Sequence, residues 1–256
     1  MIKIKTEKEI EIMKVSGRIL AETLYEVLKH VKPGVSEKEL DSLAEKLIIE
    51  KGAQPGFKKV PGYKHTICVS TNDVVVHGIP SDYKLKQGDI IGVDCGAYYQ
   101  GFHTDMSETV RVGNSSLVGQ DDEVAKFLKV GKKALEEGIK AAKLGNHVGD
   151  ISKAIQDIVE KQAGYSVVRS LVGHGVGKDL HEEPEVPGYL TGSINKTPIL
   201  KEGMVIAVEV IYNLGGNEVM HSDTDDWTIK TADGSLSGVF ERTLAITKNG
   251  TVVLTK

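Results

Sequence analysis

Apolar positions at helical spacing predict two helices at the start of the chain, followed by strands. Over residues 6–31 the periodic positions are Ile10, Met13, Ile19, Leu20, Leu24 and Leu28. Thr6 begins this helix with a capping-box pattern, and Ser36 can cap a second helix that ends at Gly52. Residues 66–112 are then rich in strand-forming sequence.

The second half of the chain repeats this order of elements. We predict a helix over residues 121–143, a turn at 144–146, a helix over residues 150–162 that ends at Gly164, and strands to the end. The first of these strands is predicted over residues 166–172. The same plan in both halves predicts an internal duplication.

A constant offset supports the duplication. The strand that carries Asp94 aligns with the strand that carries Glu209 at an offset of 115 (209 − 94), so the two acids occupy equivalent positions. We therefore predict one catalytic domain with halves of about 1–118 and 119–256. Two α+β halves of this kind would close one mixed or antiparallel sheet, with helices on its outer side and a site between the halves.

Asp94 and Glu209 each interrupt a nearly continuous apolar run. Such runs, here residues 90–95 and 204–211, are typical of strands buried on both faces. An ionised carboxylate that is buried without a partner costs several kcal/mol, so it either takes up a proton or acquires a cation. Because neither run contains Lys or Arg, the two acids indicate a bound cation.

Three further polar residues complete a candidate metal site. Asp105 follows Asp94 across a turn near Gly101, and a hairpin would bring both acids to one face. His174 lies between two glycines, which let the backbone approach a ligand closely, and Glu241 is surrounded by apolar residues. Taken singly, Asp105 also fits a solvated turn, and Glu241 also fits an exposed strand.

Four carboxylates and one imidazole carry more negative charge than one divalent ion balances. Two divalent ions about 3.5 to 4 Å apart, bridged by the acids, would balance this charge. The oxygen-rich set favours Mn, Fe, Co or Zn over a thiolate zinc site. The sequence therefore predicts two divalent metal ions as cofactors.

Three other kinds of site are excluded by residue spacing. The stretch from Gly173 to Gly177 has the spacing G-x-G-x-G, which does not fit a dinucleotide-binding loop, and it is one residue short of a phosphate-binding loop. The run that begins at His181 lacks the second histidine of the H-E-x-x-H zinc motif and contains Pro184.

The composition is that of a soluble enzyme. The 256 residues are 40% hydrophobic, enough for a sizeable core, and the net charge of −4 does not indicate nucleic-acid binding. Cys68 and Cys95 are too few for a disulfide framework and fit buried, reduced thiols. The N-terminus lacks the apolar segment of a signal peptide, and no run approaches about 18 apolar residues. We therefore expect a cytoplasmic protein with no membrane partner.

Four groups of residues form specific motifs: 72–80, 93–94 with 101–105, 173–177 with 181–184, and 226–231. On these motifs the chain resembles the methionine aminopeptidases, in the short form without an N-terminal extension, over essentially its whole length. The resemblance implies the pita-bread (creatinase/aminopeptidase) fold, an α+β fold whose two pseudo-symmetric halves form one curved, mostly antiparallel sheet with helices outside. It also implies a dimetal centre whose ligands are Asp94, Asp105, His174, Glu209 and Glu241.

The resemblance further implies a mechanism. A hydroxide that bridges the metals attacks the scissile carbonyl, and Glu209 also transfers the proton. His77 and His181 correspond to histidines that contact the scissile amide and stabilise the tetrahedral intermediate. The substrate methionine side chain would contact Tyr63, Cys68, Leu180 and Trp227. The resemblance implies that the partners are nascent polypeptide N-termini. We also expect a transient contact with the ribosome and a monomeric protein.

Some positions depart from the family pattern. Val210 and Arg242 follow two of the expected ligands in place of Pro and His, and Val60 with Lys64-His65 replaces a Tyr and a Pro-containing stretch. Arg242 would compete with a metal for the neighbouring carboxylate if it turned inward, but adjacent strand residues point to opposite faces.

Two alternatives remain. Xaa-Pro aminopeptidases and prolidases share the five-ligand set, although they generally carry a separate N-terminal domain, whereas this chain begins with helices of the catalytic type. A non-catalytic peptide-binding module on the same fold is a different class of protein. Retention of all five ligands argues against it.

Overall fold

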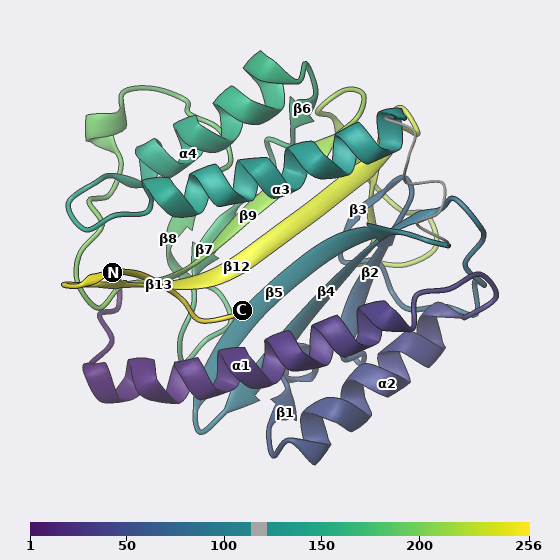
Figure 1. Ribbon diagram of the computed structural model, residues 1–256, viewed down its shortest axis with the longest axis horizontal. Helices are drawn as coiled ribbons and strands as arrows, with labels where there is room; N and C mark the ends of the chain where they lie inside the picture. Colours follow the sequence, from purple (N-terminus) through teal and green to yellow (C-terminus); the bar gives the residue numbers. More distant parts are fainter. Residues whose placement is uncertain (114–121) are drawn as a thin grey trace.

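The computed structural model describes residues 1–113 and 122–256. Its strands are β1 (Gln54–Pro55), β2 (Ile67–Thr71), β3 (Val74–Val76), β4 (Ile90–Tyr99), β5 (Phe102–Arg111), β6 (Ser166–Val167), β7 (Gly173–Gly175), β8 (Glu182–Val186), β9 (Val205–Asn213), β10 (Val219–His221), β11 (Ile229–Thr231), β12 (Ser237–Thr247) and β13 (Gly250–Val253). Ten of these form one curved antiparallel sheet (Figure 1). Seven follow the order β1-β4-β5-β12-β9-β7-β8, and β2, β6 and β13 pair with β4, β9 and β12 respectively. The strands β10, β11 and β3 form a smaller sheet. The predicted α+β fold with an antiparallel sheet is confirmed.

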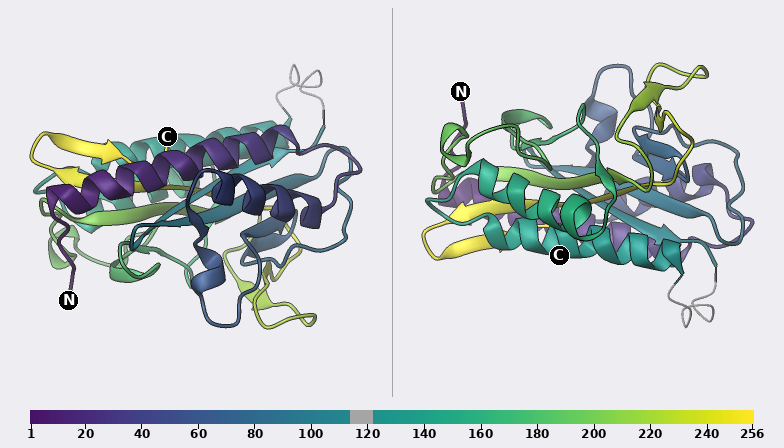
Figure 2. Two further views of the ribbon diagram at one scale, coloured as in Figure 1. Left: turned by 90° about the horizontal axis from the view of Figure 1, so that it is seen from below. Right: turned by 90° about the horizontal axis from the view of Figure 1, so that it is seen from above.

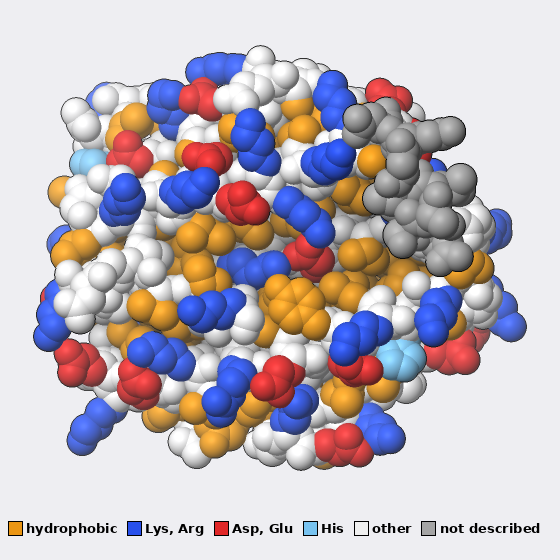
Figure 3. All heavy atoms as spheres, viewed as in Figure 1, with side chains coloured by type: hydrophobic (Ala, Val, Ile, Leu, Met, Phe, Trp, Pro, Cys, Tyr) orange, Lys and Arg blue, Asp and Glu red, His pale blue; other side chains and the backbone are white. Residues whose placement is uncertain are grey.

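Four α-helices of the described chain cover one face of the large sheet, and loops cover the other (Figure 2). α1 (Glu7–Lys29) and α2 (Glu37–Glu50) lie over the half that contains β4 and β5. α3 (Glu123–Ala141) and α4 (Val148–Gln156) lie over the half that contains β9 and β12. Positive and negative side chains are interspersed over this helical face (Figure 3). None of the described helices combines the length and apolar composition that a membrane crossing requires.

The first two helices begin at the predicted caps, and α4 begins two residues before its predicted start at residue 150. Thr6 forms the predicted capping box with Glu9, and Ser36, predicted as a cap, also forms a capping box with Glu39. Asp122 caps α3, and the predicted helix start at residue 121 lies outside the described residues. α4 continues as a π-helix over Asp157–Gln162, so the helical segment extends to the predicted end but changes type.

The predicted hairpin joins β4 to β5. Its two turn residues, Gln100 and Gly101, have φ angles of 47° and 93°, which is the backbone geometry of a type I′ turn. β4 and β9 begin at Ile90 and Val205, which are separated by the predicted offset of 115 (205 − 90). The predicted boundary at residues 118 and 119 lies outside the described residues, and the division of the domain at that point stays a prediction.

The interior has two main apolar clusters, one under each pair of helices. One cluster packs α3 and α4 against β9 and β12 and contains the buried rings of Phe127, Tyr212 and Phe240. The other packs α1 and α2 against β4 and contains Leu24 and Ile91. The central strands therefore have a mostly apolar helical face, and the residues that alternate with these point to the loop face.

The predicted strand over residues 166–172 is wrong beyond Val167. Strand β6 contains Ser166–Val167, and the Val168 N–H makes one further bond, to Ile211 O at 3.0 Å. The next residues run as a loop in which Leu171 and Val172 line a cavity on the loop face. An apolar run predicts burial, and here Leu171 and Val172 are half-buried in a cavity wall in place of a sheet.

Candidate active site

The five predicted metal ligands lie on five neighbouring strands. In sheet order these strands are β4, β5, β12, β9 and β7, and they carry Asp94, Asp105, Glu241, Glu209 and His174 respectively. Glu241 lies directly opposite Glu209, and Asp94 and Asp105 are two rungs apart in their hairpin. All five line one cavity, so the structure brings the whole predicted set together.

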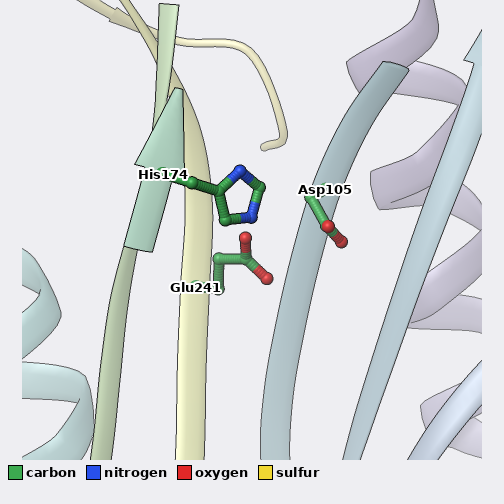
Figure 4. A group of neighbouring side chains, drawn as sticks. All are labelled: Asp105, His174 and Glu241. Atoms are coloured by element: carbon green, nitrogen blue, oxygen red, sulfur yellow. The ribbon is translucent and has the colours of Figure 1, made fainter. Parts of the chain in front are cut away.

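Three of these residues converge closely (Figure 4). One ligand atom each from Asp105, His174 and Glu241 lies within 4.8 Å of the other two, and all three residues are buried. In Figure 4 the His174 ring extends from β7 toward Asp105 on β5, next to the Glu241 carboxylate on β12. His174 Nε2 also lies 3.4 Å from Glu209 Oε1.

Glycines beside His174 let its short strand fit into the sheet. A Cβ on Gly173 would lie 2.5 Å from Ala207 O, and a Cβ on Gly175 would lie 2.2 Å from Glu183 O. His174 Nδ1 lies 2.8 Å from Gly175 O, and because a carbonyl only accepts, Nδ1 carries the proton. Nε2 therefore presents a free lone pair to the cluster, as a metal-ligating imidazole does.

The carboxylates are buried close to one another. Burial raises the pKa of Asp94, and burial with the charge of neighbouring acids raises the pKa of Asp105, Glu209 and Glu241 well above the usual range. One oxygen of Asp94 and one of Glu241 are buried without a hydrogen-bond partner. Burial lowers the pKa of His174 to about 3, so its imidazole is neutral. Mutually repelling acids around a neutral imidazole fit a divalent cation.

Arg242 does not compete for the Glu241 carboxylate. Its guanidinium lies on the helical side of the sheet, where it donates to Glu108 Oε2 at 2.7 Å and to the Tyr25 hydroxyl at 3.2 Å. Val210, the other departure beside a ligand, is fully buried in the apolar cluster on that same side. Both side chains point away from the site, as the alternation along a strand predicts.

His77 and His181 line the same cavity as the four acids and the His174 imidazole. His77 has a φ of 58°, in the left-handed region, and the next residue, Gly78, is so close to Val69 that a Cβ would lie 1.9 Å from its carbonyl oxygen. The His181 ring packs edge-on against His174, with centroids 4.3 Å apart. Burial lowers the pKa of His77 to about 4 and also lowers the pKa of His181, so both rings are neutral near pH 7.

An apolar pocket adjoins the cluster. The cavity has a volume of about 170 Å³, and all eleven predicted site residues line it. The predicted side-chain pocket residues Tyr63, Cys68, Leu180 and Trp227 belong to one apolar cluster. The rings of Tyr63 and Trp227 meet edge-on at 5.1 Å, and Asp225 fixes Trp227 by accepting from its backbone N–H at 2.8 Å.

Six further lining residues were not predicted as site residues from the sequence: Phe57, Val60, Val76, Leu171, Val172 and Ile211. Ile211 lies two residues beyond Glu209 on the same strand face, so strand periodicity could have found it. Leu171 and Val172 come directly before the Gly173-His174 pair. Phe57 has no comparable signal, because its place depends on Gly96, where a Cβ would lie 2.7 Å from the Phe57 ring.

The fold and the carboxylate–imidazole cluster define a metal-dependent peptidase. The family model described as metallopeptidase family M24 matches residues 11–248. A prolidase from Pyrococcus furiosus has a similar fold, with a TM-score of 0.77 and 26% identity, and the match covers 99% of this chain and 65% of that chain.

Other relatives match along both chains. Methionine aminopeptidase 1 of Bacillus subtilis is 47% identical over 256 residues, which is 100% of each chain. The crystal structure of methionine aminopeptidase from Thermotoga maritima matches with a TM-score of 0.93 and 40% identity, again over 100% of each chain. This chain therefore belongs to the methionine aminopeptidases of metallopeptidase family M24.

Proposed function

We propose that this protein removes the N-terminal methionine from nascent proteins and peptides by metal-dependent hydrolysis. The observation that carries this proposal is a single cavity in which four carboxylates and a neutral imidazole adjoin an apolar pocket. A cavity of this kind can hold an apolar terminal side chain while the scissile bond lies against the polar cluster.

We propose that two divalent ions, of Mn, Fe, Co or Zn, bind to Asp94, Asp105, His174, Glu209 and Glu241. The charge of four acids supports two ions, and oxygen ligands with one imidazole suit these metals. When bound, such ions polarise the scissile carbonyl and lower the pKa of the attacking water.

The proton transfers are assigned to residues of this chain. Glu209 lies in the cavity 3.4 Å from His174 Nε2, where it can take a proton from the attacking water and pass it to the leaving amine. His77 and His181 are neutral, so each can donate one hydrogen bond to the scissile amide and stabilise charge that develops on its oxygen.

The methionine side chain is assigned to the pocket of Tyr63, Cys68, Leu180 and Trp227. Burial raises the pKa of the Cys68 thiol, which keeps this residue a neutral, soft contact for a thioether. Tyr63 is held by a hydrogen bond from its hydroxyl to Ile67 O at 2.7 Å. His65, in the unusual stretch before Cys68, meets the Tyr63 ring edge-on at 5.8 Å, so this stretch acts on selectivity through Tyr63.

The cellular setting forms part of the same proposal. A substrate that is a nascent N-terminus implies a transient ribosome contact, and we propose a monomer that works in the cytoplasm. The buried free thiols Cys68 and Cys95 suit a reducing compartment. Light scattering of the purified protein should give the mass of one chain.

A peptide assay tests the proposed reaction. Chelator-treated protein is reconstituted with Mn, Co, Fe or Zn and offered Met-Gly-Met-type and Ala-Pro-type peptides. We expect release of methionine from the first peptide, with Glu209→Gln, which keeps the side-chain shape, as the inactive control. Cleavage of the Pro-containing peptide alone would instead favour an Xaa-Pro aminopeptidase, and no cleavage with any metal would favour a binding module.

A further inference from the structure

Side chains hold together the middle of the large sheet, along the line between β5 and β12, which we call the seam. In the described strands, the ladder at the seam comprises the pairs Glu241 with Ser107 and Arg242 with Met106. On its other side, β12 pairs with β9 continuously over residues 237–245. Continuing this register by one residue beyond Arg242 would place Thr243 opposite Asp105, and continuing it by two residues before Glu241 would place Val239 opposite Thr109.

At both of these positions a threonine hydroxyl takes the place of a backbone partner. Thr243 Oγ1 donates to Asp105 O at 2.8 Å and accepts from the Asp105 N–H at 2.9 Å. Thr109 Oγ1 donates to Val239 O at 2.7 Å and accepts from the Val239 N–H at 2.9 Å. Both threonines are buried, so these contacts satisfy backbone groups that water does not reach.

The two contacts are related by the pseudo-symmetry of the sheet. Thr109 and Thr243 are 134 residues apart (243 − 109), as are Asp105 and Val239 (239 − 105) and the central Ser107 and Glu241 (241 − 107). The two hydroxyls therefore hold the seam in the same way on either side of its centre. They differ in what they hold, because Asp105 carries a candidate metal ligand and Val239 carries an apolar side chain.

The backbone of Asp105 determines where its carboxylate lies. Asp105 Oδ1 accepts from the Met106 N–H at 3.0 Å, so the carboxylate is tied to the segment that Thr243 holds. At the centre of the seam, Arg242 donates to Ser107 O at 3.1 Å and to Glu241 O at 2.7 Å. With the centre held in this way, the Thr243 hydroxyl sets how far apart the two strands lie at Asp105.

We propose that Thr243 is a positioning residue for the metal centre, because its inserted hydroxyl sets the position of Asp105 relative to Glu241. This inference rests on the proposed function, since it requires that Asp105 and Glu241 bind metal. Thr109 makes equivalent bonds but holds no ligand-bearing residue. It therefore contributes to the stability of the seam without positioning a ligand directly.

Matched variants test this role. Thr243→Val and Thr109→Val each remove two hydrogen bonds and keep the side-chain shape, so both should lower the melting temperature of the metal-free protein to a similar degree. Each metal-free protein is titrated with Co²⁺ by calorimetry, and the visible absorption of bound Co²⁺ reports its coordination geometry. We expect Thr243→Val to weaken Co²⁺ binding by about 10- to 100-fold and to change the spectrum. Thr109→Val should keep the affinity and spectrum of the unmodified protein.

The outcomes separate this inference from the proposed function. Equal losses of Co²⁺ affinity in the two valine variants, or unchanged affinity in Thr243→Val, would overturn the positioning role. If Thr243→Val does not fold, Thr243→Ser and Thr243→Ala give the same comparison, because only the serine keeps the hydroxyl; equal affinities in that pair would also overturn it. An unmodified protein that binds no Co²⁺ would count against the proposed function itself.

Discussion

His77 holds a backbone conformation that few non-glycine residues adopt. Its φ of 58° places it in the left-handed region, and the chain after it passes so close to Val69 that only Gly78 fits there. Such conformations carry roughly 1 to 3 kcal/mol of strain and cluster at functional sites. The strain here lies at a residue proposed to contact the scissile amide.

We expect His77→Asn to lower kcat by about 10²- to 10³-fold while the protein keeps its metal. Asparagine tolerates the left-handed region better than alanine, so this variant removes the imidazole with little backbone change. The measurements are kcat on a Met-Gly-Met-type peptide and metal content by mass spectrometry. Asp94→Ala is the contrasting variant, because it should lose metal and activity together. A normal kcat in His77→Asn, or full metal content in Asp94→Ala, would contradict the assigned roles.

At the residue scale, the sequence predicted polar site residues better than apolar ones. A buried acid such as Asp94 is costly without a cation, so its presence in an apolar run is informative by itself. An apolar lining residue such as Phe57 has the same chemistry as any core residue. Its role depends on its position next to Gly96, which local sequence does not contain.

The segment before α1 is tied to the turn that carries His181 by a buried ion pair. Lys5 Nζ lies 2.7 Å from Glu182 Oε2, and the two side chains are only 5% and 1% exposed. Lys3 contacts the same turn through Asp179 at 2.5 Å, but that pair is largely exposed. The first residues of the chain therefore fix the turn next to a proposed catalytic histidine.

We expect Lys5→Met to destabilise the protein by about 3 kcal/mol, because it leaves Glu182 buried with a weakened ion pair. It should also raise KM for methionyl peptides, since His181 adjoins Glu182. The double variant Lys5→Met/Glu182→Gln removes both charges and should recover most of the loss. Lys3→Met should cost much less stability, because an exposed ion pair contributes little. Urea unfolding gives the free energy of unfolding of all three variants. Equal losses of stability in the two single variants would argue against a special role for Lys5.

At the element scale, the predictions that depend on near neighbours were confirmed. The helix caps at Thr6 and Ser36 and the turn at Gln100 and Gly101 involve groups within a few residues of each other. The strand predicted over 166–172 was wrong because an apolar run indicates burial but not the partner. A strand needs a neighbouring backbone to pair with, and beyond Val168 the chain follows the cavity instead.

The fold brings four carboxylates from distant parts of the chain into one buried site. Removal of the metal should therefore lower the stability of the folded protein. The pKa values of these carboxylates are raised by burial, so the metal-free native state binds more protons than the unfolded chain. Such groups lower stability as pH rises through their native pKa, which is about 7 for Asp94. Burial lowers the pKa of His77, His103 and His174, which has the opposite effect, but only below the unfolded histidine value of about 6.5.

We therefore expect the metal-free protein to lose stability as pH rises from about 6.5 to about 8.5, the range in which the carboxylates dominate. Urea midpoints of chelator-treated protein measure this. Mn²⁺-loaded protein should not show the decline, because the cation replaces the protons, and Asp94→Asn should flatten it in the metal-free form. A midpoint that stays constant or rises with pH in the metal-free protein would show that the acids are not buried together as described.

By itself, the sequence predicted the five-residue polar set that lines one cavity, the approximate extents of the helices, and the offset of 115 between Asp94 and Glu209. These features follow from local spacing and from the chemistry of single residues, such as an acid in an apolar strand. Only the tertiary structure decided how the halves meet, with Thr109 and Thr243 inserted at the seam, and which apolar residues enclose the cavity. The physical reason is that register and packing between distant strands depend on many weak contacts at once, and no short stretch of sequence contains them.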